Sequence, residues 1–419
     1  MIGPHAQAGG PVDHGAASAL PMGTEPRGID RLTLLRSAVG VAILVALLAL
    51  AAWLADAPDF GSTAAYSLLI GAALGIVFAR GRFCFFCIFR DFIERRDSAS
   101  LYAVLAALAV GSIGYAIVFG IFLPDPGSGR LPAEAHIGPV SWVLAAGGLA
   151  FGVGMALSGA CISGHLYRLG EGYGRAPIAL FGALVGFGLG FLSWSSLYLG
   201  TISTASTLWP PAAIGYAPAL LIHLAVLGVV ALLLLRWVPP TRPRDGGRPT
   251  LASVGHAVFV RRWSPLATGT LVGIIGVLAY LRVEPLGVTS QLGSVTRTVM
   301  SDAGLLGDRL NGLDVLRGCA TVVARIITDN GWLIAAFVLG SFAVSLMAGR
   351  FRPTGVTLAN GTTAFLGGVL MGWGAMVSLG CTVGTLLSGI SAMAISGWLF
   401  GLAVFAGVWL GIRLGLHRI

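Results

Sequence analysis

The stretches "MALSGACISGHLYRLGEG" (155–172) and "AMVSLGCTVGTLLSG" (375–389) each place a cysteine between closely spaced glycines inside a long apolar run. Aligned at an offset of 220 residues, five of the thirteen positions from 152 to 164 are identical in the two stretches. The paired residues are Gly152/Gly372, Gly154/Gly374, Ser158/Ser378, Cys161/Cys381 and Gly164/Gly384. A match that includes the rare cysteine predicts two related units in one chain.

The composition is that of a membrane protein. Of 419 residues, 56% are hydrophobic and 10% are charged, and the 62 glycines are about twice the usual share. Apolar runs long enough to cross a bilayer recur along most of the chain, which predicts an all-α polytopic membrane protein. All 26 basic side chains are arginine, and against 17 acidic side chains they give a net charge of +9. In a membrane protein this charge indicates arginine-rich loops on the cytoplasmic side and not nucleic-acid binding.

Hydropathy predicts ten apolar segments, and the arginines orient them. With the N-terminus in the cytoplasm, 20 arginines fall on the inner side and six lie outside or near the outer ends. Both termini are therefore expected in the cytoplasm. The predicted segments are 34–56, 61–79, 99–123, 138–157, 176–199, 213–237, 266–283, 331–349, 361–379 and 390–412.

The two units are expected to run in opposite directions through the membrane, because a single span separates their four spans each. "GAALG" (71–75) also resembles "GTLVG" (269–273), and "GRFCF" (81–85) aligns with "GVTSQ" (287–291), which places Cys84 opposite Ser290. The prediction is an inverted-topology repeat with broken or re-entrant helices that form a central pore. The expected parts are a flexible tail (1–33), an extra transmembrane helix (34–56), a first repeat (57–205), a connecting helix with a basic cytoplasmic loop (206–262) and a second repeat (263–419). A cleaved signal peptide is the alternative for the first helix, but its polar leading region would be unusually long.

Glycine-bracketed cysteines suit a substrate site inside a membrane. Glycine allows a helix to break where it is packed against protein, and the N-terminus of a half-helix favours an anion. Apolar surroundings keep a thiol neutral, so it can donate a weak S–H hydrogen bond to a sulfur-bearing anion without repelling it. A single buried cysteine usually only fills space. The repeated glycine frame makes Cys161 and Cys381 functional candidates, whereas Cys319, which lacks this frame, is interpreted as packing.

Metal, nucleotide and cofactor sites are not predicted. "CFFC" (84–87) is a single CxxC, and the seven histidines have no ligand spacing, so zinc is not expected. The sequence contains no P-loop, HExxH or GxSxG motif. No cofactor is therefore expected.

Three motifs resemble those of the YeeE/YedE family of sulfur-compound transporters. They are "GRFCFFCIFRDF" (81–92), "LSGACISGHLYRLGEG" (157–172) and "SLGCTVGTLLSG" (378–389), and the resemblance covers about residues 60–415. It implies inverted halves with short re-entrant helices, thiosulfate uptake across the bacterial inner membrane, and Cys84, Cys161 and Cys381 along the central pathway. It also implies a TusA-like cytoplasmic sulfurtransferase as a partner. The first 60 residues and the second thiol, Cys87, depart from the family pattern.

The expected function is therefore that of a transporter and not an enzyme. It imports thiosulfate or a related sulfur anion past cysteine thiols that hydrogen-bond the substrate. A membrane thiol oxidoreductase or sulfurtransferase using Cys84 and Cys87, a carrier of a selenium compound, and a structural subunit whose cysteines only pack are the alternatives. Secondary site candidates are Cys87, Arg82, Arg90, Ser163, His165, Ser290, Gln291 and Thr382, with Arg297, Arg317 and Arg325 at an outer vestibule.

Overall fold

The computed structural model describes residues 31–58, 60–238, 262–307, 309–313, 323 and 327–418. Within these ranges the chain is helical, and two isolated bridges are the only β-type pairing. The longer helices are α1 (Arg31–Asp56), α2 (Gly61–Gly81), α3 (Phe85–Arg95), α4 (Leu101–Phe122), α5 (Trp142–Ser158), α6 (Ile162–Glu171), α7 (Arg175–Gly200), α9 (Tyr216–Leu234), α11 (Pro265–Arg282), α12 (Ser290–Asp302), α13 (Asp329–Met347), α14 (Leu358–Val377) and α16 (Ile395–Arg413). The short elements are η1 (Ile202–Thr204), α8 (Pro210–Ile214), η2 (Leu235–Trp237), η3 (Thr382–Ser388), α15 (Gly389–Ser391) and η4 (Leu416–Arg418).

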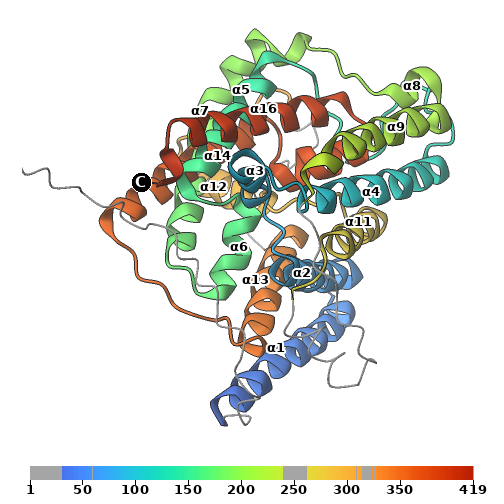
Figure 1. Cartoon of the computed structure of the whole chain (residues 1–419). Helices are drawn as coiled ribbons and strands as arrows, with labels where there is room; N and C mark the ends of the chain where they lie inside the picture. The colour runs from blue at the N-terminus through green and yellow to red at the C-terminus, as the bar shows by residue number, and fades with distance from the viewer. Residues whose placement is uncertain are drawn as a thin grey trace, which may run out of the picture.

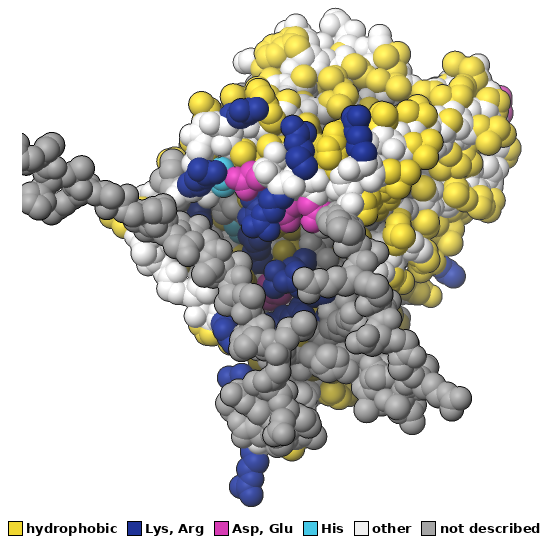
Figure 2. All heavy atoms as spheres, in the orientation of Figure 1, with side chains coloured by type: hydrophobic (Ala, Val, Ile, Leu, Met, Phe, Trp, Pro, Cys, Tyr) yellow, Lys and Arg dark blue, Asp and Glu magenta, His cyan; other side chains and the backbone are white. Residues whose placement is uncertain are grey.

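The chain is a multi-pass membrane protein. In the described ranges, nine helical segments are long and apolar enough to cross a bilayer, or ten if one bent pair is counted as a span. Each of the ten apolar segments predicted from hydropathy coincides with one long helix. On α9, Leu221 and Leu232 are 68% exposed, as expected for side chains that face lipid. Hydrophobic side chains likewise cover much of the surface in Figure 2.

The helices pack in a few extensive pairs. α14 lies against both α5 and α7, and α5 also contacts α16. α2 packs on α13, and α11 packs on α4. α1 joins the edge formed by α2 and α13, at the bottom of the view in Figure 1.

Glycines let α5 and α14 approach backbone to backbone. A Cβ added at Gly154 would lie 2.6 Å from the carbonyl oxygen of Gly367, and one at Gly367 would lie 2.6 Å from the carbonyl oxygen of Gly154. A second such contact joins Gly147 and Gly374. Small residues at helix contacts are how membrane helices gain close van der Waals packing.

Three of the long helices stop at a break and are followed at once by a short helix. The breaks span 82–84 between α2 and α3, 159–161 between α5 and α6, and 378–381 between α14 and η3. The third break bends the helix pair by 45°. Each contains a residue with left-handed backbone, and these are Arg82, Gly159 and Leu379. The broken helices expected from the sequence are therefore present.

The close contact of α5 with α14 leads to a stability prediction. Gly154→Ala should lower the free energy of unfolding by about 1–3 kcal/mol, because the added methyl group overlaps backbone atoms that cannot rotate away. Gly228→Ala on α9 is the matched control, since nothing lies within 4 Å of a Cβ added there. Heating both variants in detergent and following the monodisperse fraction by size exclusion measures the difference. If both variants lose the same monodisperse fraction at the same temperature, the predicted overlap at Gly154 would be contradicted.

Candidate functional site

The three predicted cysteines occupy the same local position, one residue before a short helix. Cys84 precedes α3, Cys161 precedes α6 and Cys381 precedes η3. All three side chains are fully buried and belong to one hydrophobic cluster. The first backbone N–H groups of a helix have no partner within it, so each cysteine lies where a helix presents donors and the positive end of its dipole.

Cys84 and Cys161 are brought into contact by the fold. Their sulfur atoms lie 3.9 Å apart, although the residues are separated by 77 positions in the chain. Either thiol can donate to the other. The distance is close to van der Waals contact for two sulfur atoms, so no anion fits between them in this arrangement.

Cys161 is held by its own helix start. Its sulfur accepts a hydrogen bond from the backbone N–H of Gly164 at 3.3 Å and lies 3.2 Å from Ser163 Oγ. A Cβ added at Gly164 would lie 2.8 Å from the sulfur of Cys84 and 3.3 Å from that of Cys161. Gly164 therefore leaves the space in which the two thiols meet.

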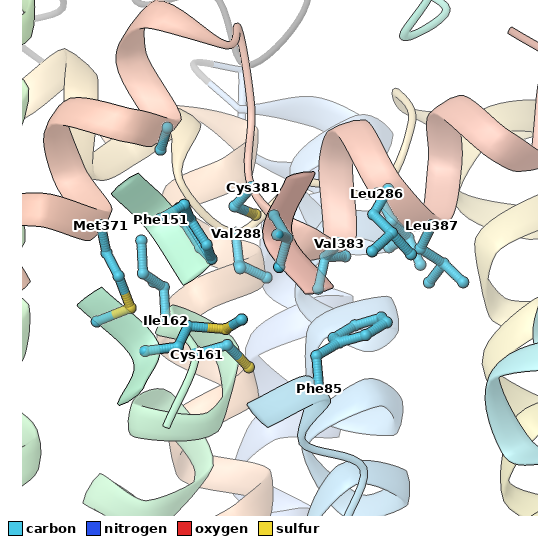
Figure 3. Close-up of a cluster of buried hydrophobic side chains, with 14 of the residues drawn as sticks. Phe85, Phe151, Cys161, Ile162, Leu286, Val288, Met371, Cys381, Val383 and Leu387 are labelled. Atoms are coloured by element: carbon cyan, nitrogen blue, oxygen red, sulfur yellow. The ribbon is translucent and has the colours of Figure 1, made fainter. Parts of the chain in front are cut away.

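Cys381 lies in the same hydrophobic cluster as Cys84 and Cys161, at the break after α14. Its carbonyl oxygen accepts from the backbone N–H of Thr385 at 2.8 Å and starts η3, a π-helical segment. Figure 3 shows Cys381 beside Val288, with Phe151 and Cys161 in the same group of buried side chains. A cavity of about 20 Å³, large enough for about one water molecule, adjoins the preceding break and is lined by Ser378, Thr385 and His136 among others.

Cys87 differs from the other described cysteines because it is partly exposed. Its sulfur accepts a hydrogen bond from the guanidinium of Arg168 at 3.0 Å, and the same guanidinium donates to the carbonyl oxygen of Gly159 at 2.7 Å. Arg168 thus links α6 to the start of α3 and to the break after α5. Arg168 is one of the 20 arginines that the sequence places on the inner side, and it is not among the predicted site residues. Its placement seven residues after Cys161, two helical turns along α6, was the available signal.

The secondary candidates lie on α3, on the short helices α6 and η3, at the start of α12 and in the break before α3. Ser163 contacts Cys161, as described above. His165 and Thr382 are buried, and within the described part of the chain His165 Nε2 and Thr382 Oγ1 have no hydrogen-bond partner. Ser290 begins α12, and the side-chain oxygen of Gln291 accepts from the backbone N–H of Thr328 at 3.2 Å. Gln291 therefore ties α12 to the start of α13.

The arginine candidates differ in their surroundings. Arg82 lies in the break before Cys84 and interacts electrostatically with Glu171, Arg262 and Arg350. Arg90 on α3 forms an ion pair with Asp91 at 2.8 Å, which partly neutralises it. On the face of the molecule drawn in Figure 2, basic and acidic side chains gather near the middle. Arg297 is buried on α12, while Arg317, Arg325 and Cys319 lie outside the described residues.

Comparison with known proteins identifies the family. The family model described as "Sulphur transport" matches residues 80–410. This chain belongs to the sulphur transport family. The matched range contains all three helix breaks and all three buried cysteines.

Its similarity to curated members extends over most of the chain. It is 30% identical over 351 residues to the thiosulfate transporter TsuA of Escherichia coli K12, covering 82% of this chain and 92% of that protein. It is 28% identical over 362 residues to the thiosulfate transporter TsuA of Spirochaeta thermophila, covering 82% and 96%. It is 23% identical over 172 residues to the probable transporter YedE of E. coli K12, covering 38% and 40%.

Among the described residues no group of three or more His, Cys, Asp or Glu could hold a metal ion.

The space at Gly164 can be tested directly. Gly164→Ala should push the Cys84 and Cys161 sulfurs apart or displace the start of α6, and so reduce any transport that depends on their contact by tenfold or more, an effect of about 1.4 kcal/mol. Uptake of labelled substrate at matched expression is the measurement, with Gly228→Ala as the control. Full activity of Gly164→Ala would show that the contact between the thiols is dispensable.

Proposed function

We propose that the protein imports thiosulfate, or a closely related sulfur-containing anion, across the bacterial inner membrane by a pathway lined by Cys84, Cys161 and Cys381. The observation that carries this proposal is the contact of the Cys84 and Cys161 thiols at the starts of two short buried helices. The names of the two TsuA relatives supply the substrate.

The chemistry of the thiols fits this substrate. Thiosulfate carries a terminal sulfur that accepts hydrogen bonds, and a neutral thiol is a weak donor with a polarizable sulfur. Weak contacts at several points allow an anion to bind without being trapped, which conduction requires. The N–H groups and dipoles at the helix starts add attraction for negative charge. Because Cys84 and Cys161 touch, the substrate can pass from one to the other once they separate.

The packing of the helices supports two inverted halves around this pathway. If α2, α4, α5 and α7 correspond to α11, α13, α14 and α16, a two-fold axis requires each contact to recur with its partners exchanged. The α5–α16 contact has its counterpart in α14–α7, and the α2–α13 contact has its counterpart in α11–α4. The reciprocal contacts Gly154–Gly367 and Gly147–Gly374 follow the same 220-residue offset. This pattern supports repeats over about 57–205 and 263–419, joined by 206–262, with the helix 34–56 outside both.

The arginine distribution sets the proposed direction. With both termini cytoplasmic, α14 ends toward the outer side and α2 and α5 end toward the inner side. The anion would meet Cys381 first, with Ser290 and Thr382 nearby as polar contacts, and then Cys161 and Cys84. Arg82 and its neighbouring arginines would receive it at the inner end. A TusA-like sulfurtransferase is the proposed acceptor there, and the protein itself performs no chemical step.

Removing either thiol should strongly reduce uptake. Cys161→Ala and Cys381→Ala each delete a hydrogen bond to a charged substrate, worth about 1.5–3 kcal/mol, so uptake should fall about tenfold to a hundredfold. The measurement is uptake of radiolabelled thiosulfate in cells that lack their own importers, with membrane expression matched to the parent.

Cys319→Ala is the matched control, because Cys319 lacks the glycine frame and is expected to be tolerated. Sulfate, sulfite and selenite are the competitors that define specificity. Normal uptake by Cys161→Ala and Cys381→Ala would leave their thiols with a packing role only. Absence of uptake by the well-expressed parent would point to another sulfur or selenium compound.

A second candidate function is sulfur transfer at Cys87, favoured by the guanidinium of Arg168 on its sulfur. A nearby cation favours the thiolate, whereas burial and the neighbouring Cys84 favour the neutral thiol, so Cys87 must first lose its proton to water. The Cys87 thiolate would attack the outer sulfur of thiosulfate, the S–S bond of thiosulfate would break, and sulfite would leave with the bonding electron pair. A persulfide would remain on Cys87.

Mass spectrometry distinguishes this reaction from transport. If sulfur transfer occurs, incubation of the purified protein with thiosulfate should add one sulfur atom to the peptide containing Cys87 and release one equivalent of sulfite. Arg168→Gln should slow the addition, and Cys87→Ser should prevent it. An unmodified peptide and no sulfite would exclude the reaction and leave transport as the function.

A further inference from the structure

Two thiols that meet deep in a protein can also react with each other. Cys84 and Cys161 are free, fully buried and 3.9 Å apart at sulfur. Each lies at a helix start with extended backbone, φ −129° and ψ 116° for Cys84 and φ −76° and ψ 172° for Cys161. A disulfide requires the sulfurs to approach to about 2.05 Å. A closure of about 1.9 Å lies within the reach of two side chains on such non-helical positions.

We propose that Cys84 and Cys161 form a reversible disulfide under oxidation, and that this bond closes the transport pathway. The bond itself follows from the position of the two sulfurs and does not depend on the substrate. Its effect on transport rests on the function proposed above. The pair is thus a redox-sensitive lock within the pathway.

The oxidant is a small two-electron acceptor that removes one hydrogen from each thiol, and an uncharged diazene such as diamide is a suitable reagent. The two S–H bonds break and one S–S bond forms. The diazene N=N bond gains the two hydrogens and becomes a hydrazine. A dithiol reductant reverses the change by thiol–disulfide exchange.

The lock follows from the geometry at Gly164. The sulfurs touch over the space that this glycine leaves, so an anion can pass only if the starts of α3 and α6 move apart. A covalent bond between Cys84 and Cys161 prevents that movement. It also removes both S–H groups, so neither sulfur can donate a hydrogen bond to the substrate.

Cys87 is the competing partner, because it lies three residues after Cys84 in the same helix. Cys84 interacts with both Cys87 and Cys161. The structure favours Cys161, whose sulfur lies 3.9 Å from that of Cys84, because the sulfur of Cys87 is also held by the guanidinium of Arg168 at 3.0 Å. The structural effect of the disulfide depends on which cysteine pairs with Cys84. A Cys84–Cys87 disulfide would lie within one short helix and would not tie α3 to α6.

Counting thiols tests the bond. The purified protein in lipid nanodiscs is treated with diamide, denatured, and labelled with a maleimide that shifts its mobility for each free thiol. The parent should lose two of its five reactive thiols, Cys87→Ser should also lose two, and Cys161→Ser should lose none. Dithiothreitol should restore the parent pattern. Loss that persists in Cys161→Ser but disappears in Cys87→Ser would overturn the proposal, as would an unchanged parent.

Uptake tests the lock. In proteoliposomes that hold the parent protein, oxidation should lower the rate of thiosulfate uptake at least about tenfold. Dithiothreitol should restore the rate. Full uptake by protein whose Cys84–Cys161 bond is confirmed by thiol counting would overturn the lock. No uptake by the reduced parent would contradict the proposed function, and the thiol count would still establish or overturn the bond.

Discussion

The backbone contact between α5 and α14 is the constraint on which the site depends. Gly154 and Gly367 bring the two helices so close that neither position has room for a side chain. Both helices then end at a break that leads to a buried cysteine. Because lipid cannot satisfy free N–H and C=O groups, such breaks are tolerated only when protein surrounds them. The close packing of the long helices provides that enclosure.

The enclosure explains the chemistry of the site. Short helices that start inside the protein present their first N–H groups to the interior, and a cysteine at each start adds a soft, polarizable sulfur. Helix starts of this kind favour negative charge without a positively charged side chain. Charge is concentrated instead at one face, where Arg82, Arg262 and Arg350 surround Glu171.

The contact between Cys84 and Cys161 gives the same two residues a second property. In the reduced state they are the proposed contact for a sulfur-bearing anion, and in the oxidised state they would form a covalent bond between α3 and α6. Their separation along the chain makes this tie effective, because it joins elements that follow different long helices. Cys87, with Arg168 at its sulfur, is chemically distinct from both.

The sequence by itself determined the ten long helices, because apolar runs of membrane length have no other stable arrangement in lipid. It also predicted helix breaks at the glycine-bracketed cysteines, and α5 and α14 end directly before Cys161 and Cys381; the role of these thiols stays a prediction. It did not identify α12 as a helix, because its polar sequence lacks a strong apolar period, and it gave Arg168 no role. Only the tertiary structure decided that Cys84 meets Cys161, that Arg168 reaches Cys87 and that Gln291 holds Thr328. These contacts join residues 37 to 81 positions apart, and the packing of separate helices, which no local pattern encodes, brings them together.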